Sequence, residues 1–160
     1  DGSTPFVILS TPGEEKTISL WNGTSNDAPP ANWYTVGFDD SAWPDSIERA
    51  EGLLVPPAGA AKVWPRAGAV IMGEGIVMRR TFALPAGAIS AASITVRVDD
   101  AVTAIYVNGV AVFLGSTGVI GPIDAPAELI AGADNVIAIA GSDLFAQAHW
   151  AAYRLEGSTV

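Results

Sequence analysis

Two adjacent aspartates, Asp99 and Asp100, stand between two strand-like runs in the stretch VDDAVTAIYVNGVAVF. Carboxylate oxygens are the hard ligands that Ca²⁺ prefers, so the pair is a candidate calcium site with Asp143 as a third ligand. Asp124 and Asn108 are further oxygen-bearing side chains that a calcium ion could recruit. The alternative is structural: Asp100 ends one strand and caps the turn into the next, bonding nearby backbone N–H groups.

Aromatic side chains are the second group that could bind a ligand, because a flat ring stacks on the apolar face of a pyranose. Trp64 lies in a segment rich in Pro, Gly and Ala, which makes it the first candidate for an exposed ring. Burial in the core is the alternative for every aromatic residue. The sugar-binding set that we expect is Trp64, Tyr34, Trp21, Arg66 and Asn108.

Catalytic chemistry has little support in the sequence. His149 is the single histidine, and no G-x-S-x-G nucleophile turn accompanies it. One histidine does not build a histidine-rich metal site, so we interpret it as a surface or edge residue. Seventeen acidic residues in a small domain produce many accidental carboxylate pairs, so a two-carboxylate glycosidase is not indicated. We expect a protein that is not an enzyme.

Strands are the elements that must position these residues. Residues 94–98 alternate apolar and polar side chains, which is typical of a half-buried strand. Asn108-Gly109 between the runs 102–107 and 110–113 is a strong hairpin signal, because a tight turn needs positive φ at both residues. Segment 51–75, rich in Pro and Gly, predicts a long irregular excursion. Further strands are expected over 6–9, 17–21, 76–84, 135–140 and 148–155, about eight or nine in all.

Composition narrows the class of protein. A chain of 160 residues fits one domain, and the absence of cysteine excludes disulfides and thiolate zinc sites. Seventeen glycines, eleven prolines and only 16% charged residues favour an all-β domain over a helical one. A net charge of −9 repels phosphate backbones and anionic membranes, so nucleic acid is an unexpected partner. No apolar run is long enough to predict membrane insertion.

Four phrases come in a familiar order over residues 33–155: NWYTVGFDDSAW, MRRTFALPAG, ITVRVDDAVTAIYVNGVAVF and LIAGADNVIAIAGSD. The series resembles the galactose-binding-domain-like modules attached to β-galactosidase- and rhamnosidase-type glycosidases. The resemblance implies an all-β jelly-roll β-sandwich and a non-catalytic, carbohydrate-binding role. It also implies that Trp33 and Trp43 are buried and that Asp39, Asp40 and Ser41 form a structural cap on a helical turn.

The DD…YVNG phrase also looks like the sugar-binding modules of the protective-antigen type found in adhesins and toxins. In those modules an Asp-Asp pair with a cis peptide bond holds Ca²⁺, and the calcium holds sugar hydroxyls. The resemblance implies that Asp99 and Asp100 are the calcium ligands here. The chain is short for that family and lacks an aromatic-rich start.

We therefore expect a single-domain, lectin-like module of a larger extracellular or surface protein, such as a glycosidase or adhesin. One shallow site binds sugar weakly, so several copies would be needed for avidity. The alternative is a structural or decoration subunit of a phage, virus or cell-surface assembly, with neighbouring copies as partners and no sugar ligand. A solvent-facing Trp64 beside polar groups would favour the first hypothesis, and an apolar patch covered by a second chain would favour the second.

Overall fold

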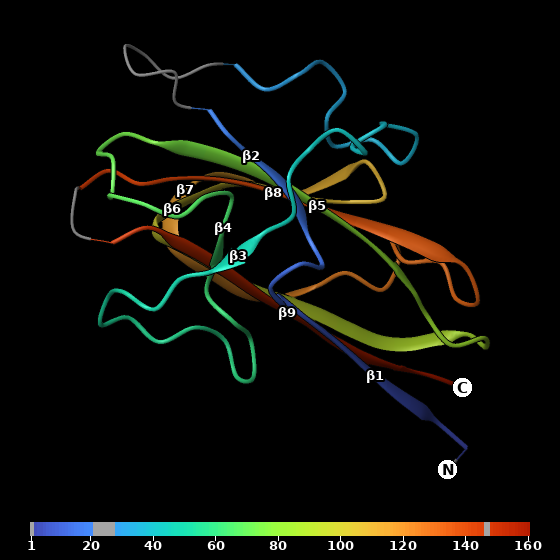
Figure 1. Cartoon of the computed structure of the whole chain (residues 1–160). Coiled ribbons are helices and arrows are strands. Elements are labelled where there is room, and N and C mark those ends of the chain that lie inside the picture. The colour runs from blue at the N-terminus through green and yellow to red at the C-terminus, as the bar shows by residue number, and fades with distance from the viewer. Residues whose placement is uncertain (1, 21–27, 146–147) are drawn as a thin grey trace.

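The computed structural model describes residues 2–20, 28–145 and 148–160. Within these ranges the protein is all-β and has no helix, which confirms the predicted fold class, whereas jelly-roll connectivity stays a prediction (Figure 1). No helix long and apolar enough to cross a membrane occurs there. The strands are β1 (Thr4–Leu9), β2 (Lys16–Ser19), β3 (Ile47–Glu48), β4 (Val63–Trp64), β5 (Gly75–Ala83), β6 (Ile89–Val107), β7 (Val110–Asp124), β8 (Asp134–Ser142) and β9 (Trp150–Thr159).

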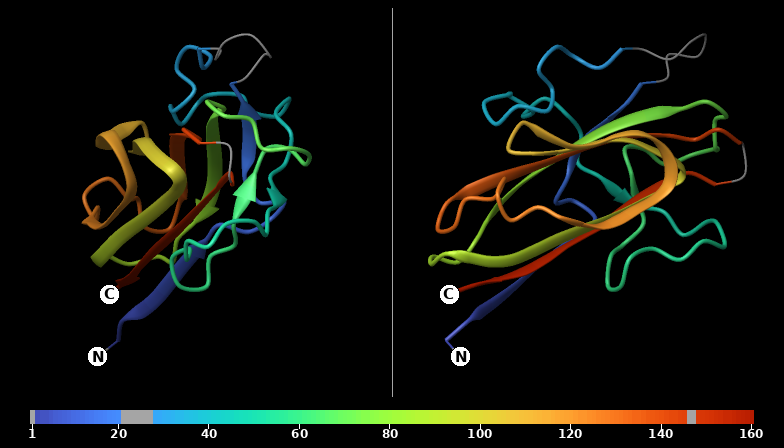
Figure 2. Two further views of the ribbon diagram at one scale, coloured as in Figure 1. Left: turned by 90° about the vertical axis from the view of Figure 1, so that its left-hand side faces the viewer. Right: turned by 180° about the vertical axis from the view of Figure 1, so that it is seen from behind.

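The strands form one continuous antiparallel sheet in the order β2-β5-β8-β6-β9-β4-β3, with β1 added beside β9 and β7 beside β6. The sheet curls on itself, as the two turned views show (Figure 2). Its inner faces enclose a core of large apolar side chains that include Trp64, Ile94, Ile105, Tyr153 and Leu155, all fully buried. The curl therefore provides the hydrophobic burial that a domain without disulfides needs.

The longest strand, β6, changes its neighbour midway. Its first part pairs with β9 as far as Asp99, which lies opposite Trp150. From Ala101 onward it pairs with β8, beginning opposite Ser142. The two separate strands predicted over 94–98 and 102–107 are thus one element. Asp100 occupies the place where β6 leaves one partner and joins the other.

The predicted hairpin is confirmed. Asn108 and Gly109 have φ angles of 50° and 81°, and Val107 pairs with Val110 across the turn. The strand after the turn continues to Asp124, well beyond the predicted 110–113, because it stays paired with β6. Segment 51–75 is not wholly irregular, since it contains β4, which pairs with both β3 and β9.

The FDDSAW loop is fastened to β5. Arg79 is almost fully buried and donates to the Asp40 carboxylate at 2.8 Å and to the carbonyl oxygens of Trp33 and Thr35 at 2.8 and 2.6 Å. Trp33 and Trp43 are buried, as predicted. The Asp39 carboxylate accepts a hydrogen bond from the Ser41 backbone N–H at 3.0 Å, so it closes a turn. The predicted helical turn is absent from this part of the described chain because residues 41–43 form only a turn and bend.

Candidate functional site

A pocket of about 420 Å³ opens in the described part of the molecule. Three segments that are distant in sequence meet there: the loop after β3, the middle of β6 and the β8–β9 connection. The lining consists of Gly52, Leu53, Leu54, Asp99, Asp100 and Ala148. Two of the three aspartates that the sequence singled out as calcium ligands therefore face a cavity.

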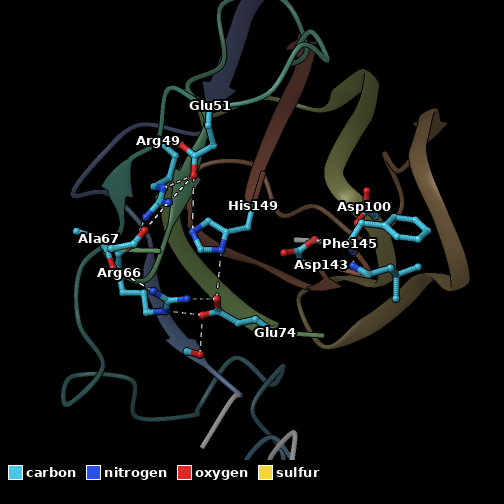
Figure 3. Close-up of polar contacts among 12 residues, drawn as sticks. Arg49, Glu51, Arg66, Ala67, Glu74, Asp100, Asp143, Phe145 and His149 are labelled. Atoms are coloured by element: carbon cyan, nitrogen blue, oxygen red, sulfur yellow. Dashed lines mark hydrogen bonds and ion pairs between the residues drawn. The ribbon is translucent and has the colours of Figure 1, made fainter. Parts of the chain in front are cut away.

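Residues 144–145, which follow β8, contact Asp100 through their backbone. One carboxylate oxygen of Asp100 accepts hydrogen bonds from the backbone N–H groups of Leu144 and Phe145 at 2.8 and 2.9 Å. The Asp143 carboxylate accepts a further bond from the Phe145 N–H at 3.1 Å (Figure 3). The prediction that the Asp100 carboxylate accepts hydrogen bonds from backbone N–H groups is therefore confirmed. The prediction that it ends a strand and caps the next turn is wrong. Asp100 lies inside a strand, and its donors come from residues more than 40 positions away.

The carboxylates of the pocket repel one another. Burial and the neighbouring Asp100 raise the pKa of Asp99 to about 6. Burial and the same neighbour raise the pKa of Asp143 to about 7. Burial also acts to raise the pKa of Asp100, but hydrogen bonds from Asp99, Leu144 and Asp143 outweigh it and lower that pKa. The site therefore favours the uptake of a proton or a cation near neutral pH.

Asp143 joins the aspartate pair, but the three side chains do not assemble a ready metal centre. Asp143 is fully buried, and one of its carboxylate oxygens has no hydrogen-bond partner among the described residues. The Asp99-Asp100 peptide bond is cis. No group of three or more His, Cys, Asp and Glu side chains in the described chain is placed to hold a metal ion. Oxygen chemistry thus fits calcium, whereas the present geometry does not preform its coordination shell.

Asn108 has a structural role at the hairpin. Its amide nitrogen donates to the Glu128 carbonyl at 2.7 Å and to the Asn135 side chain at 2.8 Å. Its amide oxygen accepts from the Val136 N–H at 2.8 Å. Both polar atoms of its side chain thus fasten the β6–β7 turn to β8 and to the segment that precedes β8. Asp124, at the far end of β7, pairs with Ser93 and likewise lies outside the described pocket lining.

Trp64 is not an exposed ring. Its exposed fraction is 0%, because β4 places it in the core between β3 and β9. Arg66, its predicted companion, forms a two-pronged ion pair with Glu74 at 2.5 and 2.9 Å. Neither residue faces the described pocket, so neither prediction of a sugar contact is supported.

Tyr34 stacks on Tyr106, with ring centroids 4.1 Å apart, and meets Trp33 edge-on. The described lining of the pocket does not include it. Trp21, the remaining predicted aromatic ligand, lies outside the described residues.

His149 is fully buried, so its predicted place at the surface or edge is wrong. Its Nδ1 lies 3.2 Å from a Glu74 oxygen, its Nε2 lies 3.7 Å from a Glu51 oxygen, and its ring stacks on Trp64. Burial acts to raise the pKa of Glu74, but the adjacent His149 and hydrogen bonds from Arg66 and Ser19 outweigh it and lower the pKa to about 2. Arg49 pairs with Glu51 at 2.5 Å.

The cluster of charged residues formed by Arg49, Glu51, Arg66, Glu74 and His149 connects two walls of the pocket. Glu51 directly precedes Gly52, and His149 directly follows Ala148, so the contact between them ties both lining segments together (Figure 3). The cluster joins four segments that no local pattern relates, which is why sequence reasoning missed it.

Sequence reasoning also missed the apolar rim of the pocket. Leu53 and Leu54 belong to the lining, and Phe145, which is 63% exposed, donates its backbone N–H to the lining residue Asp100. The sequence indicates this rim by two phrases, GLLV at 52–55 and DLF at 143–145, in which large apolar residues occur within loops.

Comparison with protein-family models, curated proteins and solved structures finds no match. The resemblance to galactose-binding-like modules therefore stays a prediction, and the function must be inferred from the pocket itself.

Proposed function

We propose that the chain is a non-catalytic carbohydrate-binding module of an extracellular or surface protein, and that the sugar occupies the Asp99–Asp100 pocket. The observation that carries the proposal is a lining that joins two carboxylates to aliphatic side chains within about 420 Å³. A sugar ring has hydroxyls at its edge and C–H groups on its face, so it matches both parts of this lining. The volume falls in the range of small-molecule sites.

Four of the six lining residues have a role in this proposal. The Asp99 carboxylate accepts hydrogen bonds from sugar hydroxyls. Asp100 is held by two backbone N–H groups and shapes the site with its remaining oxygen. Leu54 and Ala148 contact the C–H face of the ring. Because Asp99 and Asp100 are neighbours on one strand instead of facing each other across a cleft, the arrangement favours binding over glycoside hydrolysis.

Calcium is the cofactor that the family resemblance implies. Asp99 and Asp100, with Asp143 beside them, are the residues that would hold it, and the ion would supply charge neutralisation and coordination of sugar hydroxyls. The unpaired, buried oxygen of Asp143 and the all-oxygen donor set support this part of the proposal. The lack of a ready three-residue metal group in the described chain speaks against a preformed site. Calcium dependence is therefore tested separately from sugar binding.

A glycan array probed with the folded protein, in calcium and in EDTA, tests both points. We expect binding to a restricted set of glycans and its loss in Asp99→Asn. Asp124→Asn removes the same charge from an exposed position outside the pocket and is expected to bind glycans as the unmutated protein does. Absence of glycan binding by the folded, unmutated protein would overturn the proposal. Binding that persists in EDTA would remove only its calcium component.

A structural subunit is the second candidate, and β7 is the observation that favours it. Among the described residues β7 pairs only with β6, and residues 110–123 contain no charged side chain. A long edge strand without charges is a template for pairing with another chain. Sedimentation at rising concentration would show self-association in this case, and Leu114→Lys, which adds a charge to an exposed position of β7, would abolish it.

A further inference from the structure

Exposed apolar residues are concentrated in two chain segments that border the pocket. Five of the thirteen exposed large hydrophobic residues in the described chain occupy two short segments there: Leu53, Leu54, Val55, Leu144 and Phe145. Leu53 is 100% exposed and Phe145 is 63% exposed. Clustered apolar surface of this kind marks a place where something binds, whereas single exposed hydrophobic residues need no explanation.

The apolar rim and the carboxylates form one continuous site. Leu53 and Leu54 line the same pocket as Asp99 and Asp100. The Asp100 carboxylate in turn holds the backbone N–H groups of Leu144 and Phe145. A ligand whose polar part reaches Asp99 therefore extends over apolar side chains as it leaves the pocket.

We propose that the ligand is an amphipathic glycoside, in which a neutral sugar enters the carboxylate pocket and a hydrocarbon aglycone lies on the rim formed by Leu53, Leu54 and Phe145. This inference rests on the proposed function and specifies its ligand class. A sugar without an aglycone leaves the rim in water. The net charge of −9 and the acidic pocket disfavour an anionic aglycone, so the apolar part is uncharged hydrocarbon.

Matched pairs of glycosides test the inference. Methyl and octyl glycosides of β-D-galactose, β-D-glucose and α-D-mannose are titrated below their micelle-forming concentrations, and affinity is measured by calorimetry. Burial of each methylene multiplies affinity by about two- to fourfold, so we expect the octyl glycoside to bind at least about tenfold more tightly. Leu53→Ser is expected to bring the ratio of octyl to methyl glycoside affinity close to one.

Leu114→Ser is the matched control, because Leu114 is 65% exposed on β7, outside the described pocket lining. It is expected to retain the octyl preference, and thermal unfolding of each variant checks that the protein is folded. Phosphatidylcholine vesicles without glycolipid test whether the rim binds a membrane surface instead.

The outcomes separate the two proposals. Equal affinity for methyl and octyl glycosides overturns the inference and leaves sugar binding intact. Octyl binding that Asp99→Asn does not weaken shows adsorption of hydrocarbon alone and overturns the inference. Binding to the plain vesicles overturns the glycoside assignment in favour of a membrane surface. Failure of all six glycosides to bind overturns the inference, while the glycan array decides independently whether sugar binding stands.

Discussion

Asp143 is a carboxyl group that the fold buries beside two other carboxylates. Its pKa of about 7 and the pKa of about 6 at Asp99 both exceed the ordinary value of 3.8. The folded protein therefore binds more protons than the unfolded chain between about pH 4 and pH 7. This contribution to stability is complete below pH 4 and is lost as the pH rises through 6 and 7. Glu74 opposes this trend only below about pH 4.5, because its pKa of about 2 in the folded protein makes its contribution fall from there downward.

Asp143→Asn tests this account at the residue scale. In the parent protein we expect the midpoint of thermal unfolding to rise as the pH falls from 8 to 5, by about 2–4 °C for each kcal/mol gained. The variant cannot take up this proton, so its midpoint should depend less on pH over that range. Asp124→Asn, at an exposed position, should behave as the parent does. A variant with the parent's full pH dependence would show that Asp143 is not the group involved.

The residues that sequence reasoning placed well are those with a local signal. Trp33 and Trp43 belong to a phrase whose resemblance to galactose-binding-like modules implied burial, and both are buried. Trp64 and His149 were misplaced because their burial depends on distant partners. Trp64 enters the core only because β4 lies between β3 and β9. His149 is enclosed by Glu51 and Glu74, which come from other loops.

At the scale of elements, β9 is held between β1 and the first part of β6, and Gly157 makes this close approach possible. A Cβ atom at Gly157 would lie 2.1 Å from the Ala91 carbonyl oxygen and 2.6 Å from the Phe6 ring. Gly157→Ala is therefore expected to lower the free energy of unfolding by at least about 1–3 kcal/mol, measured by urea denaturation. Gly37→Ala, where a Cβ would meet nothing within 4 Å, is the matched control. Equal stability of the two variants would contradict the packing described here.

Element prediction succeeded where the pattern was local and failed where pairing was distant. The Asn108-Gly109 turn could be located from two residues, because few residues accept positive φ. The unity of β6 could not be predicted, because Asp99 and Asp100 resemble a strand end and only pairing with β9 and then β8 makes the strand continuous. The full length of β7 depends in the same way on its pairing with β6.

At the scale of the whole molecule, the chain carries a net charge of −9, and the pocket concentrates part of it. A cation that binds only the folded state stabilises it, by about 2.7 kcal/mol at one hundred times its Kd. If the calcium proposal holds, Ca²⁺ will raise the unfolding midpoint near pH 7.5, and Asp99→Asn will abolish the rise. The rise will be smaller near pH 5, because protons then compete for Asp99 and Asp143. Mg²⁺ is the comparison ion, and an unchanged midpoint in Ca²⁺ would refute calcium binding.

The change of neighbours within β6 has a consequence for the exchange of backbone amide hydrogens with solvent deuterium. Amides on either side of the aspartate pair belong to ladders with β9 and β8, so they should exchange slowly. Asp100 has no ladder partner in β8 or β9, and the pairing with β7 is also interrupted between Arg97 and Val102. Exchange measured by NMR should therefore reveal rapid labelling at this interruption inside the longest strand. Uniform protection from Val98 to Val102 would show that the ladder is closed there, and any ligand that seals the pocket should slow labelling at this point.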